Sequence, residues 1–252
     1  MLSGTRRTFA IVGAHVAILY MHGLAIATGE AREACATGQP LYDVVHALQA
    51  RGGWWINWTL HIDNLLVIQL LSLWVLIGLI LHPQRQVLFR RFIVFHATLA
   101  VIRAVSIWVT TIPSPTDACR DRFMTASPFV RAISLTIDAI GGRHEWFGLG
   151  AGGNTCCDII ISGHAAMLVV AAVIIGMTWK AAWVRWGAWA LATLGLIGSI
   201  RPDRHYTVEV LLTTLIGVLV VEVYGSRVKA RGKVVGWIEE EERFGTLRRL
   251  GA

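Results

Sequence analysis

The 252-residue sequence has few charged residues: Asp, Glu, Lys and Arg make up only 15% of it, whereas hydrophobic residues make up 55%. A typical soluble domain has about 25% charged residues. The shortage of charge excludes an ordinary water-covered domain, because so much apolar surface needs a non-aqueous environment. Eleven tryptophans agree with this, since indole rings favour the membrane–water boundary. The sequence therefore predicts an all-α, polytopic membrane protein.

The net charge of +7 could indicate nucleic-acid binding, but the sequence lacks a soluble basic domain that could bind nucleic acid. We therefore expect no nucleic-acid partner. We also expect no cleavable secretory signal. The first apolar stretch, Phe9 to Ala27, is long enough to span a membrane, and no convincing A-x-A cleavage site follows it. We therefore expect this stretch to be the first membrane span.

Six apolar stretches approach or exceed the ~20 residues that a transmembrane helix needs. These predicted spans cover roughly residues 8–28, 60–82, 92–112, 159–179, 183–200 and 206–224. Two of the connections between them, 29–59 and 113–158, are long. We expect a six-span membrane domain over residues 1–225 and a charged tail over residues 226–252.

The distribution of Lys and Arg predicts the orientation, because cytoplasmic loops are richer in these residues. With an even number of spans, both termini lie on one side. That side holds most of the 23 basic residues, including Arg6, Arg7, Lys180, Arg185 and those of the C-terminal tail. We therefore expect both termini in the cytoplasm and both long connections on the lumenal or exterior side.

Only four cysteines are present, and all fall on the predicted non-cytoplasmic side: Cys35, Cys119, Cys156 and Cys157. Disulfides form in that environment. A bridge from Cys119 to Cys156 or Cys157 would tie the second long connection to the start of the fourth span. Four free, buried thiols are the alternative, and the sequence leaves this choice open.

Polar residues gather at the outer ends of the fourth and sixth predicted spans, which both run from outside to inside. The fourth begins with Asp158, Ser162 and His164. The sixth begins after His205, and Glu209 follows four residues later on the same helical face. Ionisable residues inside a membrane are costly and indicate function by default.

Two histidines and a carboxylate suit covalent group transfer. One imidazole, oriented by the carboxylate, attacks an electrophile, while the other acts first as an acid and then as a base. A phosphoryl centre also needs cations around its non-bridging oxygens. The candidates are Arg103 inside the third span and Arg201 and Arg204 beside His205.

Each of these residues also has a purely structural interpretation. A histidine near a span end is usually an interfacial polar residue, and Arg103 could pair with a carboxylate inside the bundle. Asp158 could cap the helix that follows it. The coincidence of such residues on two helices that enter from one side favours a catalytic site.

Four motifs resemble the sphingomyelin synthase family, whose members are related to membrane lipid phosphate phosphatases. CCDIIISGHAAML, residues 156–168, is similar to the family's C-G-D-x-x-x-S-G-H-T, and HYTVEV, residues 205–210, is similar to H-Y-T-x-D-V. Residues 90–115 resemble the family segment with an intramembrane arginine, and PLYDVVH, residues 40–46, resembles P-L-P-D-x-x-F/H. The motifs occur in family order over about residues 40–225.

The resemblance implies a six-span fold and a site on the lumenal or exoplasmic side, in the Golgi or the plasma membrane. It implies transfer of a phosphoalcohol head group from a glycerophospholipid to ceramide, with release of diacylglycerol and without a metal or other cofactor. By position, His205 is the nucleophile, Glu209 its supporting carboxylate, and His164 the acid and base. Asp158 matches the aspartate of C-G-D.

The sequence departs from the family pattern at three positions. Glu209 replaces an aspartate, Cys157 replaces a glycine, and Ala165 replaces the threonine after His164. A glutamate four residues after His205 can still reach Nδ1 of that ring by a change of rotamer. We therefore expect the site to keep its function.

Two other functions stay open. A lipid phosphate phosphatase would use the same histidines with water as acceptor, but its K-x-x-x-x-x-x-R-P motif is absent and Arg201 has the wrong spacing from His205. A non-catalytic transporter or scramblase would scatter polar residues along whole helices, whereas here they gather at the outer ends. The head group also stays open between phosphocholine, phosphoethanolamine and phosphoinositol. Four acidic residues are candidates to attract a cationic head group: Asp43, Asp63, Asp117 and Glu145.

Overall fold

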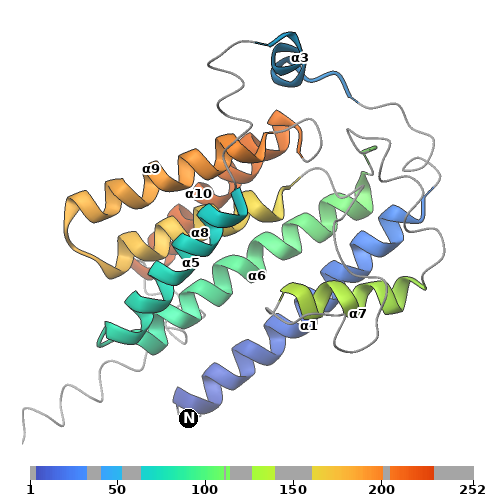
Figure 1. Cartoon of the computed structure of the whole chain (residues 1–252). Helices are drawn as coiled ribbons and strands as arrows, with labels where there is room; N and C mark the ends of the chain where they lie inside the picture. Colours follow the sequence, from blue (N-terminus) through green and yellow to red (C-terminus); the bar gives the residue numbers. More distant parts are fainter. Residues whose placement is uncertain are drawn as a thin grey trace, which may run out of the picture.

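A computed structural model of the chain shows a bundle of helices (Figure 1). It describes residues 4–32, 41–52, 64–110, 112–113, 127–139, 161–200 and 205–229. The helices are α1 (Gly4–Glu30), α3 (Val44–Arg51), α5 (Asn64–Leu81), α6 (Arg85–Val109), α7 (Pro128–Ala139), α8 (Gly163–Thr178), α9 (Ala182–Ser199) and α10 (Thr207–Lys229). The predicted all-α class is confirmed for these residues, and all helices except α3 and α7 coincide with predicted spans.

In the described part of the chain, three helical segments are long and apolar enough to cross a membrane: Thr5–Glu30, Arg85–Val109 and Thr207–Ser226. The shorter apolar segments Leu66–Leu81 and Gly163–Thr178 lie in α5 and α8. The structure therefore supports a membrane protein with three candidate spans. The full set of six spans, the cytoplasmic termini and the boundary near residue 225 stay predictions.

The core of the bundle forms around α8, which packs against α5, α6, α9 and α10. Nearly every residue from Ala165 to Ile175 is buried. A helix that is apolar on all sides, as α8 is, belongs inside a bundle. Small residues on its neighbours allow close packing: a β-carbon at Gly195 of α9 would lie 2.8 Å from the Leu168 side chain of α8.

α1 joins the bundle through α6 (Figure 1). Two polar contacts lie in the interface between these helices. Nε of Arg90 donates to the Thr8 hydroxyl at 3.2 Å, and Nδ1 of His96 lies 3.3 Å from Nε2 of His15. Apolar side chains alone specify the relative position of two helices only weakly. These polar contacts therefore help to fix how α1 lies along α6.

The two long connections contain helices that the sequence analysis did not predict. α3 lies beyond one end of the bundle, and α7 packs against α1 (Figure 1). The buried Arg131 of α7 donates from Nε to Oε2 of Glu30 on α1 at 3.1 Å. The outer side of α7 exposes Phe129 and Ile133. Polar residues thus face inward and apolar residues outward, as expected for a helix in contact with lipid.

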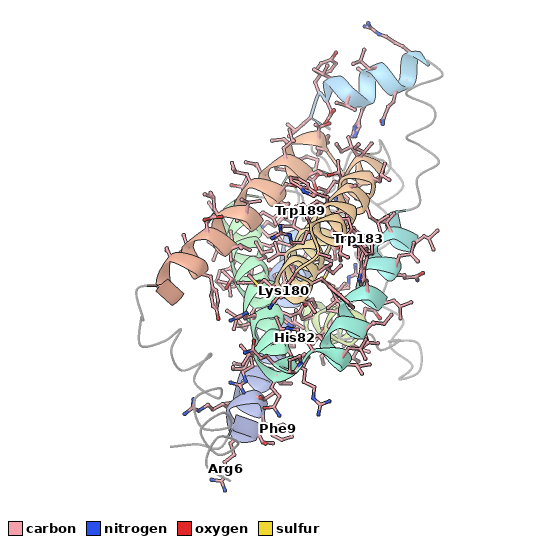
Figure 2. The ribbon with its side chains drawn as sticks, turned by 90° about the vertical axis from the view of Figure 1, so that its left-hand side faces the viewer. Arg6, Phe9, His82, Lys180, Trp183 and Trp189 are labelled. Atoms are coloured by element: carbon pink, nitrogen blue, oxygen red, sulfur yellow. The ribbon has the colours of Figure 1, made fainter. Side chains whose placement is uncertain are left out.

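Two basic residues show which side of the bundle is predicted to face the cytoplasm. Arg6 and Lys180, both assigned to the cytoplasmic side from the sequence, lie in the half of the molecule away from α3 (Figure 2). Trp183 and Trp186 project from α9 with 76% and 73% of their surface exposed. Exposed indole rings on an apolar helix are typical of a lipid-facing surface.

Candidate active site

α10 begins with a carboxylate that binds its own first turn. Oε1 of Glu209 accepts the backbone N–H of Tyr206 at 2.7 Å. A side chain that reaches back in this way satisfies one of the free N–H groups at a helix start. Oε2 of Glu209 lies 2.8 Å from Nδ1 of His205, and the carboxylate is fully buried. The prediction that a glutamate can reach this nitrogen is confirmed.

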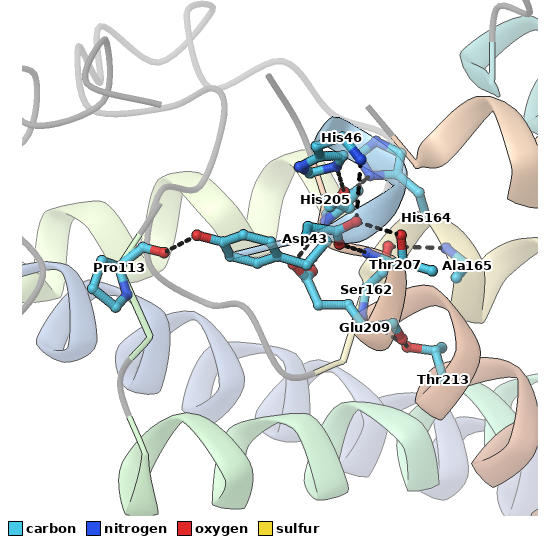
Figure 3. Close-up of polar contacts among 11 residues, drawn as sticks. Asp43, His46, Pro113, Ser162, His164, Ala165, His205, Thr207, Glu209 and Thr213 are labelled. Carbon is cyan, nitrogen blue, oxygen red and sulfur yellow. Dashed lines mark hydrogen bonds and ion pairs between the residues drawn. The ribbon is translucent and has the colours of Figure 1, made fainter. Parts of the chain in front are cut away.

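The rings of His164 and His205 meet between the N-terminal ends of α8 and α10 (Figure 3). Nδ1 of His164 lies 3.2 Å from Nε2 of His205. The ring centroids are 5.4 Å apart, and the ring planes are inclined by 62°. The two helices thus bring together the histidines that the sequence analysis singled out.

The hydrogen bonds indicate where the protons of this pair lie. Because a carboxylate accepts, Nδ1 of His205 carries the proton that Glu209 binds. Nε2 of a neutral His205 then presents its lone pair, and the proton between the rings belongs to Nδ1 of His164. One ring is therefore arranged as a nucleophile, and the other is arranged as a proton donor.

Ser162 and Thr213 hold the start of α8 against α10. The Ser162 hydroxyl caps α8 by accepting a backbone N–H of its first turn at 3.3 Å. The Ser162 N–H donates to the Thr213 hydroxyl at 2.8 Å, which donates to the Glu209 carbonyl at 2.6 Å. His164 is thereby fixed relative to α10. Thr213 was not predicted from the sequence, where the available signal was a hydroxyl residue inside an apolar run.

Arg103 reaches the N-terminal end of α8 from α6. A β-carbon built on Gly163 would overlap the Arg103 guanidinium group, so the glycine permits this close approach. The charges of Glu209 and Glu30 both act on Arg103. A guanidinium group and a helix N-terminus together create positive potential beside His164. The structure thus places the predicted Arg103 beside Gly163, the residue before His164.

Residues of the first long connection lie over the same site (Figure 3). Oδ2 of Asp43 accepts the N–H of Thr207 at 2.6 Å, and Nε2 of His46 lies 3.0 Å from the carbonyl oxygen of His205. Burial raises the pKa of the Asp43 carboxyl, but hydrogen bonds from Thr207 and His46 outweigh this effect and lower the pKa below its ordinary value. Both residues belong to PLYDVVH, but the sequence alone did not place Asp43 at the site, and His46 was not predicted there.

Tyr206 connects the site to two further segments. Its phenol oxygen accepts the N–H of Leu41 at 2.9 Å and donates to the carbonyl of Pro113 at 3.3 Å. Its ring stacks on His46, with centroids 5.8 Å apart. Burial raises the pKa of Tyr206, and neighbouring carboxylates add to this effect. The phenol therefore stays protonated and can donate at neutral pH.

Several predicted residues lie outside the described part of the chain. Among the site residues these are Asp158, Arg201 and Arg204. The four cysteines, and with them the predicted disulfide, also lie outside it, as do Asp63, Asp117 and Glu145. Within the described ranges, no group of three or more His, Cys, Asp or Glu side chains is arranged to hold a metal ion.

Comparison with known proteins defines the class of this chain. Residues 155–226 match a family model described as PAP2 superfamily C-terminal. The matched stretch contains His164, His205 and Glu209, together with α8, α9 and most of α10. This part of the chain, which contains both histidines, is therefore similar to the PAP2 superfamily C-terminal domain.

Over a longer region, the chain is homologous to the phosphatidylcholine:ceramide cholinephosphotransferases, the sphingomyelin synthases. It is 29% identical over 187 residues to phosphatidylcholine:ceramide cholinephosphotransferase 1 of Caenorhabditis elegans, covering 69% of this chain and 37% of that protein. For the Homo sapiens protein of the same name, the identity is 27% over 169 residues, covering 62% and 38%. For phosphatidylcholine:ceramide cholinephosphotransferase 2 of Mus musculus, it is 26% over 164 residues, covering 62% and 43%. The chain thus spans less than half the length of these curated relatives.

Proposed function

We propose that the protein transfers the phosphoalcohol head group of a glycerophospholipid to ceramide and releases diacylglycerol through a phosphohistidine intermediate. Phosphocholine is the first candidate head group, because the relatives are named for phosphatidylcholine and ceramide. Phosphoethanolamine and then phosphoinositol follow. The observation that carries the proposal is the contact of His164 with His205, whose other nitrogen is bound by Glu209.

In the first step, Nε2 of His205 attacks the phosphorus of the donor lipid, and the P–O bond to diacylglycerol breaks. The phosphoryl group enters between the ring nitrogens, which lie 3.2 Å apart. His164 acts in its cationic form and gives its Nδ1 proton to the departing glycerol oxygen. Glu209 stabilises the positive charge that develops on His205, as the carboxylate of a catalytic triad does.

In the second step, His164 is neutral and removes the proton from the primary hydroxyl of ceramide. The hydroxyl oxygen attacks phosphorus, the N–P bond breaks, and Nε2 of His205 regains its lone pair. The proton that His164 gave in the first step is recovered in the second. Both histidines therefore return to their starting states without net uptake or release of a proton.

Three arginines are proposed to bind the phosphate group. Arg103 is the best supported, because it lies against Gly163 at the start of α8. A cation and a helix N-terminus at this position would stabilise the charge on the non-bridging oxygens. Arg201 and Arg204 are proposed from their places just before His205 in the sequence. Asp158 is proposed as a further catalytic residue from its place in the same motif as His164.

The reaction is proposed to occur at the lumenal or exoplasmic leaflet of the Golgi or plasma membrane. Both termini would then lie in the cytoplasm. The distribution of Lys and Arg supports this orientation. The position of Arg6 and Lys180 in the half of the molecule away from α3 also supports it (Figure 2).

Hydrolysis is a second candidate, and the match to the PAP2 superfamily C-terminal domain favours it. The same phosphohistidine would react with water if water, rather than ceramide, reached the phosphorus. The product would then be a free phosphoalcohol. The arrangement of His164, His205 and Glu209 serves both reactions, so the acceptor that reaches the site distinguishes them.

A reconstituted assay tests these alternatives. Purified protein in liposomes is supplied with ceramide and with phosphatidylcholine labelled in its head group. Labelled sphingomyelin demonstrates transfer, free phosphocholine demonstrates hydrolysis, and movement of label between leaflets without a product demonstrates a scramblase. Donors with ethanolamine or inositol head groups then define specificity. Absence of any phosphoryl product with every donor would contradict the proposed function.

A further inference from the structure

We propose that Asp43 is a positioning residue for His205 and that it acts through α3 and the first turn of α10. The starting observation is that α3 is only eight residues long and that little apolar burial holds it in place. Tyr42 and Val44 are 80% and 61% exposed. Polar contacts therefore supply the attachment, and those formed with other described residues lead to the residues around His205.

These contacts come from one face of α3. Asp43, His46 and Gln49 follow one another at intervals of three residues, so they lie on the same side of the helix. Each binds a different residue at the junction of α9 and α10. Asp43 binds Thr207, His46 binds the His205 carbonyl oxygen, and Gln49 donates to the Ile200 carbonyl at 3.0 Å.

The Asp43 carboxylate caps two helices at once. Oδ1 accepts the N–H groups of Val45 and His46 at 2.9 and 3.2 Å, which makes Asp43 the N-cap of α3. Oδ2 accepts the N–H of Thr207 at 2.6 Å, and Oδ1 accepts the Thr207 hydroxyl at 2.9 Å. Free N–H groups at both helix starts are therefore satisfied by a single side chain. Figure 3 shows Asp43 between His46 and Thr207.

This arrangement holds His205 by its backbone as well as by its ring. Glu209 binds the ring and the following N–H, His46 lies 3.0 Å from the carbonyl oxygen, and Asp43 binds the N–H of Thr207. Asp43 also sets the position of His46, because it caps the helix on which His46 lies. Without Asp43, the His205 ring would still be bound to Glu209. The backbone next to His205 would lose its bond to Asp43, and Nε2 would then be less well oriented toward His164.

The variant Asp43→Asn separates the two caps. The amide oxygen of asparagine can keep the bonds from the α3 N–H groups, but the amide nitrogen is a donor and cannot accept the N–H of Thr207. The milder variant Thr207→Val removes the hydroxyl bond and keeps the backbone bond. Arg51→Gln changes the charge of α3 at an exposed position at its other end and serves as the matched control.

The inference rests on the proposed function for its kinetic readout, so a second readout is independent of activity. We measure kcat and KM for transfer to ceramide, together with the ¹⁵N NMR signals of the His205 ring in histidine-labelled protein. Asp43→Asn is expected to lower kcat about 10- to 100-fold with little change in KM, because small misplacements of reacting groups have effects of this size. Thr207→Val is expected to have a smaller effect in the same direction. Both variants should shift the His205 signals, and Arg51→Gln should shift neither readout.

The outcomes separate the two proposals. If the wild-type protein transfers no head group but Asp43→Asn shifts the His205 signals, the positioning role stands and the proposed function fails. If wild-type protein is active and Asp43→Asn leaves kcat and the His205 signals unchanged, the positioning role is overturned. It is also overturned if kcat falls while the His205 signals stay unchanged, or if Arg51→Gln has the same effects. Should Asp43→Asn not fold, Thr207→Val decides by the same two readouts.

Discussion

Among the described residues, two histidine pairs are nearly identical in geometry and differ in their surroundings. Nδ1 of His164 lies 3.2 Å from Nε2 of His205, and Nδ1 of His96 lies 3.3 Å from Nε2 of His15. The ring centroids are 5.4 and 5.1 Å apart, and both pairs meet edge to face. A short distance between two imidazoles therefore does not by itself define an active site.

The difference lies in what binds the second nitrogen of each ring. Nδ1 of His205 is bound by a buried carboxylate that can stabilise a cationic ring. Nδ1 of His15 has no hydrogen-bond partner among the described residues, and His96 stacks on Phe92. His15 and His96 lie near the middle of two helices, and no described contact binds a carboxylate to either ring. This pair suits helix packing. A pair at two helix starts, with a buried carboxylate bound to one of the rings, suits reaction at phosphorus.

The largest effect is expected from removing the proposed nucleophile. His205→Ala should lower the rate of head-group transfer by at least about 10³-fold, because the covalent intermediate can no longer form. His164→Ala should be similarly impaired. The measurement is transfer from labelled phosphatidylcholine to ceramide in liposomes.

Because residues that act as a unit show non-additive effects, the variant lacking both histidines should be no slower than the slower single variant. If the free-energy losses of the two single variants instead add up in the double variant, the two rings do not act in one mechanism. Circular dichroism spectra that match the wild type serve as the control for folding.

The next largest effect is expected at Glu209. Glu209→Ala should nearly abolish transfer, with a loss of about 10²- to 10⁴-fold, because the His205 ring loses both its orientation and the group that stabilises its positive charge. Glu209→Asp should keep or raise the activity, since aspartate occupies this place in the family pattern. Steady-state rates of both variants test this expectation, and a fully active alanine variant would contradict the role of Glu209.

The residues of the two-histidine site could be found from the sequence because of a local signal. His164, His205 and Glu209 are ionisable residues at the starts of long apolar stretches. Burial of an ionisable group in a membrane costs free energy, so such residues are candidates for a function. Their approach to one another followed from the predicted topology, because the fourth and sixth spans run in the same direction. Apolar stretches of sufficient length likewise revealed the helices of the bundle.

The rest could not be found from the sequence, because it depends on contacts between distant segments. Asp43 and Thr207 are 164 positions apart, and no local pattern says which helix start an aspartate will cap. α7 was not predicted because it is short and because its polar and apolar residues lie on the opposite sides from those of a water-exposed helix: Arg131 is buried and Phe129 is exposed. The pair formed by His15 and His96 was missed because each is a single polar residue within an apolar run.

A smaller effect is expected where Arg103 approaches α8. Gly163→Ala should displace the Arg103 guanidinium group, because the new β-carbon would overlap it. Loss of one stabilising group beside the phosphate should lower kcat about 10- to 100-fold. The matched control is Gly195→Ala, whose β-carbon would crowd Leu168 in the core.

The control should lower the melting temperature and leave the kcat of the folded protein unchanged, because overpacking destabilises by about 1–3 kcal/mol without touching the site. Measurement of kcat and melting temperature for both variants separates the two effects. Equal kcat for Gly163→Ala and the wild type would remove Arg103 from the proposed phosphate site.

The smallest effect on activity is expected at the second histidine pair. His96→Leu should cost about 1 kcal/mol of stability, because it leaves His15 without its ring partner inside the bundle. Replacing both histidines by leucine should restore the stability or raise it, since apolar substitutes for a complete buried polar pair are often neutral or stabilising. Both variants should transfer head groups at rates within about threefold of the wild type, because neither ring has a role in the proposed reaction. Thermal unfolding followed by tryptophan fluorescence, together with the liposome assay, tests this. A large loss of transfer in a stably folded double variant would show that the two pairs work together, and the contrast between them would then fail.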